Sequence, residues 1–407
     1  MINDSRVVVT GLGCVSALGY SVAEFWAALL NGRSGIGPIT LVPHDAVQVT
    51  VAAEVPGYDE RDHFDDRAIQ TCDRYTQFAL LAAREAIADA GFEASRGAAR
   101  GDETAVIVAS GVGGWTTIES AVRRLHGPEH ARPHPLTIPR MMISAATSHI
   151  CREFGLRGPA FTVSSACASS NHALGEAYWM IRSGRARAAV VGGAEAEIGI
   201  TAQRGWESLR VLAPDTCRPF SRDRRGMVIG EGAAILILES LDDARRRGAR
   251  IYCELAGYGL SADAGDIVAP DADGAARAMR QAMDTARLNP DDVEYINAHG
   301  TGTALNDATE VRAIRAVLGE AAYRVMVSST KSMHGHALGA TAAIEAVATV
   351  KAIAEGVVPP TVNYTTPDPE CDLDHVPNVA RARPVRVALS NSLAFGGLNA
   401  VVAFRAL

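Results

Sequence analysis

Cys167 lies in a segment that could position a nucleophile. It sits in SSACASS (Ser164–Ser170), between a strand pattern at Phe161–Val163 and a helical pattern that extends to Met180. A cysteine at the first turn of a helix lies near backbone N–H groups that have no helical partner and near the positive end of the helix dipole. The sequence therefore predicts a lowered thiol pKa and an adjacent oxyanion hole. The alternative is a buried structural cysteine, which is the commoner fate of an isolated one.

Two later turns carry the partners that a nucleophilic thiol needs for managing protons and charge. The segment NAHGTGT places His299 at the end of a predicted strand. The segment SSTKSMHGHALG places Lys331, His334 and His336 after another predicted strand. A single histidine is more often a packing residue, but two strand-end turns flanked by Gly and Ser or Thr favour a catalytic role.

The elements that position these turns are typical of an α/β protein. Short β-branched runs alternate with Ala-rich helical patterns, and continuous apolar strands imply sheets covered on both faces. The expected strands are Arg6–Thr10, Thr104–Ala109, Ala188–Val191, Ala233–Glu239, Glu294–Asn297, Val325–Ser328, Val387–Ser390 and Val401–Phe404. The expected helices are Asp73–Ala90, Ala168–Ser183, Gly274–Ala286, Asp307–Leu318 and Ala340–Glu355.

The two halves of the chain are weakly similar to each other. RVVVTGLGCVSALG near the start and IYCELAGYGLSADA at 251–264 each indicate a strand followed by a Gly-rich bend. Each half then has a strand that runs into a small-residue turn and a helix. We predict an internal duplication, with residues 1–250 carrying the cysteine and residues 251–407 carrying the histidines and the lysine. The charged segment Asp242–Arg250 marks the join.

Composition limits the class of protein. The net charge is −7, which argues against a nucleic-acid binder with a basic face. We find neither a signal peptide nor an apolar run long enough for a membrane span, so we expect no membrane association. The seven cysteines are scattered and never in CxxC spacing, which fits reduced thiols in the cytoplasm.

Cofactor and metal sites are not indicated. Gly11-Leu12-Gly13 follows a strand, but the sixth position of a dinucleotide fingerprint is Ser16, and no acidic residue stands about 20 positions on. His334 and His336 have a spacing that could suit a metal, yet no Cys, Asp or His near them in the sequence completes a ligand set. We therefore expect no metal and no bound cofactor.

Five segments together resemble one enzyme family. SSACASS, AHGTGT, KSMHGHALGA and NSLAFGG occur in this order, and RPFSRDRRGMVIGEGAA accompanies them. They resemble the β-ketoacyl-acyl-carrier-protein synthases of the type II elongating class, in the thiolase superfamily. The nearest groups are synthase II, the nodulation-type synthases and the ketosynthases of type II polyketide systems. The resemblance spans the whole chain and implies a thiolase-like α/β fold, with duplicated βαβαβαββ halves in α-β-α-β-α layers.

The resemblance also implies an activity and a set of roles. The activity is decarboxylative Claisen condensation of a malonyl-carrier protein with a cysteine-bound acyl chain, in fatty-acid, polyketide or polyene synthesis. Cys167 would take the acyl chain from phosphopantetheine, and His299 and His336 would bind the malonyl thioester and assist decarboxylation. Lys331 would pair with Glu345 and bias the histidines. The alternative for Glu345 is a solvated residue on a helix face.

Other positions match family residues that surround the substrate. Backbone N–H groups of Cys167 and Phe395 would form the oxyanion hole. Thr301 and Thr303 match threonines that hydrogen-bond the pantetheine arm, although they could simply shape a turn. Leu393 stands in NSLAFGGLN, which resembles a gating loop in which synthase II has Phe at this place and Gly at the next, Ala394.

Three positions match places where relatives line or close the acyl tunnel near a dimer interface. They are Val112, Glu197 and Trp206. A carboxyl in an apolar tunnel is costly when unpaired. Glu197 could therefore point away, pair with an arginine or mark an altered pocket. His334 is unusual beside the family pattern. It could perturb the pKa of His336 or face solvent, and we expect it to face solvent.

The resemblance implies an acyl carrier protein as partner and a dimer, either with itself or with a chain-length-factor-like subunit. The region before Asp73 has few of the basic residues with which synthase II binds its carrier, leaving Arg67 and Arg74 as nearby charges. An alternative function is a non-catalytic chain-length-factor-like subunit, but such subunits generally lack the nucleophilic cysteine. A degradative thiolase is disfavoured because the last cysteine, Cys371, lies in the polar segment DPECDLD.

Overall fold

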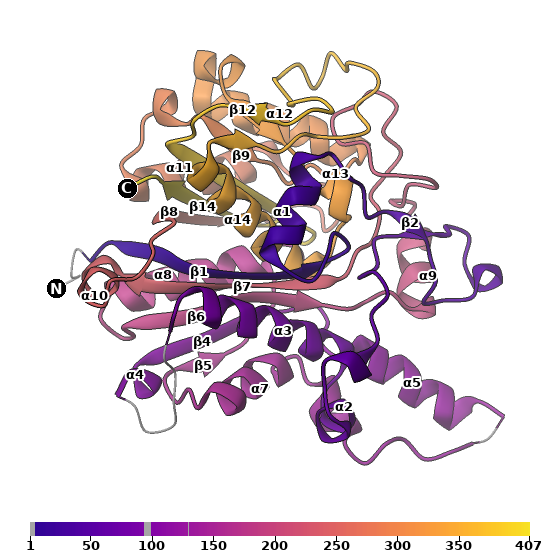
Figure 1. Cartoon of the computed structure of the whole chain (residues 1–407). Helices are drawn as coiled ribbons and strands as arrows, with labels where there is room; N and C mark the ends of the chain where they lie inside the picture. Colours follow the sequence, from indigo (N-terminus) through magenta and orange to yellow (C-terminus); the bar gives the residue numbers. More distant parts are fainter. Residues whose placement is uncertain (1–4, 93–98, 129) are drawn as a thin grey trace.

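A central sheet organises the computed structural model, which describes residues 5–92, 99–128 and 130–407. Ten strands in this described part form one sheet in the order β10-β9-β13-β14-β8-β1-β7-β6-β4-β5 (Figure 1). The strands are β1 (Val7–Ser16), β4 (Thr104–Ala109), β5 (Ala160–Phe161), β6 (Ala188–Glu195), β7 (Gly232–Ser240), β8 (Cys253–Ala262), β9 (Tyr295–Asn297), β10 (Met326–Ser328), β13 (Val387–Ala394) and β14 (Leu398–Arg405). Short strands β2 (Gly37–Pro38) with β3 (Val51–Ala52), and β11 (Val357–Val358) with β12 (Arg381–Ala382), form two small ribbons.

The order of the strands is symmetric about the middle of the sheet. From the centre outward, β1-β7-β6-β4-β5 come from the first half of the chain and β8-β14-β13-β9-β10 from the second. In both halves the three inner strands pair antiparallel and the outer ones pair parallel. The halves join where Val7–Val9 pair with Cys253–Leu255. This repeated pattern confirms the duplicated α/β architecture.

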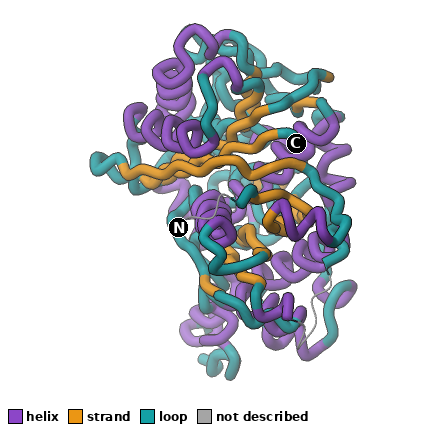
Figure 2. The backbone as a smooth tube through the Cα atoms, turned by 90° about the vertical axis from the view of Figure 1, so that its left-hand side faces the viewer, coloured by secondary structure: helices purple, strands orange, loops and turns teal. Residues whose placement is uncertain are grey.

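Helices fill the space between the two halves of the sheet and cover both outer faces. The central helices α8 (Ser169–Arg182) and α14 (Leu338–Glu355) each contact strands of both halves. The outer layers hold α3 (Arg74–Asp89) and α7 (Ala145–Phe154) on one side, and α11 (Ala272–Ala286) and α12 (Ala304–Leu318) on the other (Figures 1 and 2). The result is the α-β-α-β-α layering expected from the family resemblance.

The remaining helices lie around this core. They are α1 (Val22–Leu30), α2 (Asp66–Thr71), α4 (Ala99–Asp102), α5 (Trp115–His126), α6 (Thr137–Met141), α9 (Ile200–Ser208), α10 (Leu241–Arg246) and α13 (Lys331–His334). Among the described residues, no helix has both the length and the apolar character needed to cross a membrane.

The glycines near each central strand do not form the bends that we predicted. β1 continues through Gly11 and Gly13, and β8 continues through Gly257 and Gly259. A Cβ at Gly11 or Gly13 would collide with the backbone of α3, and a Cβ at Gly257 or Gly259 with the backbone of α11. The predicted bends are wrong because these glycines instead let a helix lie directly on the strand.

Candidate active site

The turn before α8 presents Cys167 to a cavity. Ala166 has a left-handed backbone, with φ of 49°, which an alanine adopts only when its surroundings hold it there. The Ser169 hydroxyl supplies part of that hold, because it donates to the Ala166 carbonyl at 2.6 Å and accepts from the Ser165 N–H at 2.8 Å. The sulfur is buried but lines the cavity.

The thiol of Cys167 is protonated at rest. Burial raises its pKa to about 12, and the charge of Lys331 and hydrogen bonds from the backbone N–H groups of Phe395 and Cys167 offset this only in part. The predicted lowering of the pKa is therefore wrong, because loss of solvent outweighs the helix terminus. The same hydrogen bonds place two N–H groups at the sulfur, where the sequence predicted an oxyanion hole.

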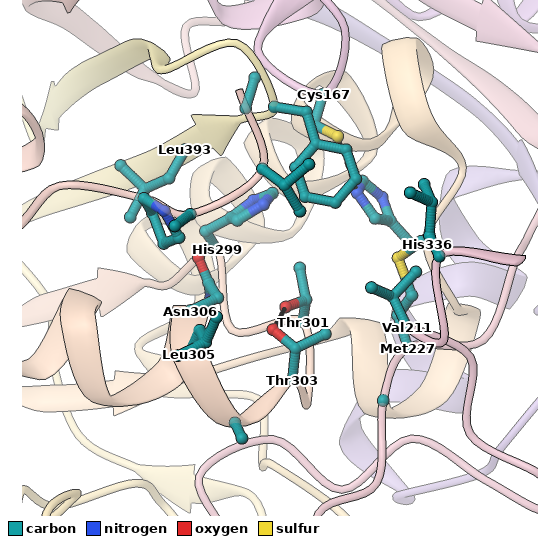
Figure 3. A pocket seen from close by; sticks show the side chains of 18 of the residues that line it. Cys167, Val211, Met227, His299, Thr301, Thr303, Leu305, Asn306, His336 and Leu393 are labelled. Carbon is teal, nitrogen blue, oxygen red and sulfur yellow. Dashed lines mark hydrogen bonds between the residues drawn. The ribbon is translucent and has the colours of Figure 1, made fainter. Parts of the chain in front are cut away.

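His336 lies against the cysteine in a defined tautomer. Its Nε2 is 3.1 Å from the Cys167 sulfur (Figure 3). Its Nδ1 is 2.9 Å from the Thr341 hydroxyl and 3.3 Å from the Leu338 backbone nitrogen. Because a backbone N–H only donates, Nδ1 is the acceptor and Nε2 carries the ring proton. His336 therefore offers a hydrogen-bond donor at the sulfur.

His299 is held through its main chain. Its N–H and that of Gly300 donate to the two carboxylate oxygens of Glu310, at 2.8 Å each, and its carbonyl accepts from the Lys331 ammonium at 2.6 Å. The His299 and His336 rings are 5.5 Å apart and nearly perpendicular. Burial and the charge of Lys331 hold the pKa of both histidines well below the usual range, so both are neutral at pH 7.

Lys331 and Glu345 form a buried ion pair. The ammonium donates to the carboxylate at 2.5 Å, and both side chains are fully buried, which rules out the solvated alternative for Glu345. His334 is also buried, with Nε2 2.9 Å from the Thr330 hydroxyl. Our expectation that His334 faces solvent is wrong, because its ring packs into the core beside Phe25, where burial lowers its pKa to about 3.

The cavity of about 370 Å³ connects the cysteine to the surface. Among the predicted substrate-binding residues, Thr301, Thr303, Trp206 and Leu393 line it together with Phe395, Cys167, His299 and His336 (Figure 3). Thr301 and Thr303 share a hydrogen bond of 2.9 Å. Val112 and Glu197 do not line the cavity. The Val112 N–H instead lies 3.3 Å from Glu195, and Glu197 lies behind Trp206, whose side chain hydrogen-bonds to it.

Two positioning residues gave no signal in the sequence. Glu310 stands within α12 and secures the His299 turn, and Asn391 donates to it at 3.1 Å. Thr341 stands in the first turn of α14 and orients His336. Both lie within helices that follow their histidines, so only the folded contacts distinguish them from packing residues.

The ligand atoms of Cys167, His299 and His336 lie within 4.8 Å of one another, close enough to surround a metal ion. Our prediction that no residue completes a ligand set at His336 is therefore wrong, because Cys167 and His299 come close to it only in the fold. A thiol must lose its proton to bind a metal, and burial opposes that loss here. The absence of a metal remains a prediction.

Two family models match the chain. The N-terminal domain of β-ketoacyl synthase matches residues 4–244, and the C-terminal domain matches residues 252–365. The chain belongs to the β-ketoacyl synthase family. This β-ketoacyl synthase is 49% identical to nodulation protein E of Rhizobium sp. (strain N33), over 99% of both chains. It is 42% identical to 3-oxoacyl-acyl-carrier-protein synthase 2 of Staphylococcus aureus (strain COL), over 100% of this chain and 99% of that one.

Solved structures show the same fold. The ishigamide ketosynthase/chain length factor matches with a TM-score of 0.94 and 38% identity, over 99% of both chains. A type II polyketide synthase ketosynthase, solved with its acyl-carrier protein, matches with a TM-score of 0.90 and 36% identity, over 99% of this chain and 100% of that one. The chain is thus a condensing enzyme with a thiolase-like fold.

The raised pKa of Cys167 predicts how acyl loading depends on pH. Because the thiolate is the nucleophile, and its fraction below the pKa grows with pH, the rate of thioester formation rises about tenfold per pH unit between about pH 7 and pH 9. Rapid-quench intact-mass measurement of acyl loading checks this. A plateau below pH 8 would instead mean that the helix terminus and the two N–H groups outweigh burial.

Replacing Lys331 by methionine destabilises the protein. Loss of the cation leaves Glu345 buried without its partner, which costs about 3–5 kcal/mol of unfolding free energy. The matched control is Lys351→Met in the more exposed Lys351–Glu355 pair, which costs about 1 kcal/mol or less. Denaturant unfolding measures the unfolding free energy of both variants. Equal losses of stability would contradict a special role for the buried pair.

Proposed function

We propose that the chain is an acyl-carrier-protein-dependent β-ketoacyl synthase whose reacting groups are Cys167, His299 and His336. One observation carries the proposal: the Cys167 sulfur lies 3.1 Å from a histidine Nε2, with a second neutral histidine beside it in the same cavity. A nucleophilic thiol, two hydrogen-bond donors and an adjacent pair of backbone N–H groups suit thioester chemistry in which negative charge develops on oxygen.

The first step moves the acyl chain. The Cys167 sulfur attacks the carbonyl of an acyl-pantetheine thioester, the backbone N–H groups of Cys167 and Phe395 stabilise the tetrahedral oxyanion, and the carbon–sulfur bond to pantetheine breaks. The thiol proton of Cys167 leaves with the pantetheine thiol. One thioester is exchanged for another, so no cofactor is needed.

The second step makes the carbon–carbon bond. A malonyl thioester enters the cavity with its carbonyl oxygen facing His299 and His336. Loss of carbon dioxide leaves an enolate, whose oxygen these neutral rings stabilise by donating hydrogen bonds. The enolate carbon attacks the acyl-Cys167 carbonyl and releases the cysteine thiolate, which takes up a proton. The product is a 3-oxoacyl thioester two carbons longer.

Substrates would arrive on the phosphopantetheine of an acyl carrier protein, with Thr301 and Thr303 facing that arm at the cavity wall. Solved relatives include a ketosynthase with its acyl-carrier protein and a ketosynthase/chain length factor, which supports a carrier partner and a dimer of either kind. Arg74 is bound to Glu231 at 2.6 Å, so Arg67, on α2, is the exposed one of the two charges predicted there. We place the enzyme in the cytoplasm, in fatty-acid or type II polyketide synthesis.

A non-catalytic, chain-length-factor-like role is the alternative, and the intact cysteine argues against it. The test is intact-mass analysis after mixing the protein with acyl-carrier protein, followed by peptide mapping. We expect one acyl group on Cys167, and a longer 3-oxoacyl chain on the carrier after addition of malonyl-carrier protein. Modification of another cysteine, or none, would refute the proposed function.

A further inference from the structure

An aromatic pair forms part of the cavity wall that also holds Cys167. Trp206, on α9, lines the cavity with Cys167, and its ring centroid is 5.9 Å from that of Phe395. Glu197 follows β6 by two residues and lies on the other side of Trp206, outside the cavity lining. The side chain of Trp206 hydrogen-bonds to the Glu197 carboxyl. A polar group therefore stands directly behind a wall residue of the cavity that holds Cys167.

Glu197 is buried without a full set of partners. Glu197 is only 6% exposed, and its Oε2 has no hydrogen-bond partner among the described residues. No Lys or Arg of the described chain forms an ion pair with it. Its charged neighbours, Glu195 and Glu119, are themselves acidic, and together with burial they raise the Glu197 pKa to about 8. At neutral pH the group is therefore mainly the uncharged acid, still able to form a hydrogen bond.

The neighbouring carboxyl, that of Glu195, has a structural role. Glu195, also fully buried, bonds to the Ser110 hydroxyl at 2.8 Å and to the N–H groups of Gly111 at 2.6 Å, Val112 at 3.3 Å and Gly339 at 3.0 Å. These bonds tie β6 to the turn after β4 and to the start of α14. Glu197 ties no comparable set of segments together, so its burial calls for a different account.

We propose that Glu197 is a specificity-determining residue that makes the cavity wall at Trp206 polar and selects against saturated chains that extend past Trp206. The inference rests on the proposed function, because it needs an acyl chain on Cys167. A saturated chain that displaces the indole removes the hydrogen bond between Trp206 and the Glu197 carboxyl and surrounds both carboxyl oxygens with methylene groups. A chain that ends before Trp206, or carries an oxygen at that depth, avoids this penalty.

The size of the effect follows from the cost of an unpaired buried polar group. That cost lowers kcat/KM for long saturated primers about tenfold or more relative to short ones. This loss of kcat/KM is caused by the polarity of the Glu197 side chain and not by its volume. Leucine and glutamine are similar in size to glutamate, so Glu197→Leu and Glu197→Gln separate the two explanations.

The experiment measures kcat/KM of the full chain with short and long saturated acyl-carrier proteins. We expect Glu197→Leu to raise the long-to-short ratio about tenfold, and Glu197→Gln to keep the wild-type ratio within about twofold. An unchanged ratio in Glu197→Leu overturns the inference. An equal rise of the long-to-short ratio in both variants also overturns it, because the effect would then come from side-chain volume or from loss of the acid, and not from polarity.

A second measurement needs no variant. The wild-type protein is offered two primers of equal length, one saturated and one with a hydroxyl at the far end, and acyl loading on Cys167 is followed by intact mass. We expect faster loading of the hydroxylated primer at lengths that pass Trp206 and equal loading at shorter lengths. Equal loading at every length overturns the inference while leaving the proposed function intact. Loading of no primer at all refutes the proposed function, and this inference with it.

Discussion

The Cys167→Ala variant loses condensation, by about a thousandfold or more in kcat/KM, yet still releases carbon dioxide from a malonyl thioester. The first effect follows because no other group in the cavity can hold the acyl chain as a thioester. The second follows because His299 and His336, with Lys331 and Glu345 behind them, keep their positions when a small buried sulfur is removed. Product analysis by mass spectrometry and a carbon dioxide assay measure the two reactions separately.

A matched cysteine variant controls for general damage. Cys151 lies on α7, half-buried and outside the cavity lining, so Cys151→Ala should keep both activities. If Cys167→Ala still elongates acyl chains, the nucleophile has been assigned wrongly. If it loses decarboxylation as completely as condensation while remaining folded, then the sulfur takes part in binding the malonyl group.

Local patterns were enough to predict the sheet and the turns at its edges. Strand β4 was predicted with its observed bounds, and most other elements within a few residues, because β-branched runs and Ala-rich periodic runs differ strongly in local preference. The strand-end turns indicated a functional role for Cys167 and the histidines, and the family resemblance joined Cys167, His299 and His336 into one site. The predicted strand at Phe161–Val163 is shorter and begins earlier, at Ala160.

What the sequence could not show depends on burial. The pKa shift of Cys167 was predicted from its position at a helix terminus. Its direction is instead set by burial, which segments distant in the sequence impose. His334 was expected to face solvent, whereas the fold packs it beside Phe25. Gly11 and Gly13 were taken for a bend, and only the packed α3 explains why glycines stand within a continuous strand there.

His336→Ala and His299→Ala should each slow malonyl decarboxylation about a hundredfold to a thousandfold. Each variant removes one neutral donor from the oxygen on which the enolate charge develops. The His336 donor is the better fixed, because Thr341 and the Leu338 N–H both bind its other ring nitrogen, whereas Nδ1 of His299 has no partner among the described residues. His336→Asn, which keeps an N–H donor, should therefore retain more activity than His336→Ala.

The control for these variants is His334→Asn, in the same turn and equally buried. His334 does not line the cavity, so the change should lower stability and leave the decarboxylation rate of the folded protein within about twofold of wild type. Decarboxylation is assayed in the Cys167→Ala background, where no acyl transfer competes. Normal turnover in His299→Ala would remove that ring from the mechanism. If His334→Asn loses as much decarboxylation activity as His336→Ala, the effects come from disturbed packing and not from lost hydrogen bonds. The comparison thus distinguishes stabilisation of the enolate from the integrity of the segment that carries His334 and His336.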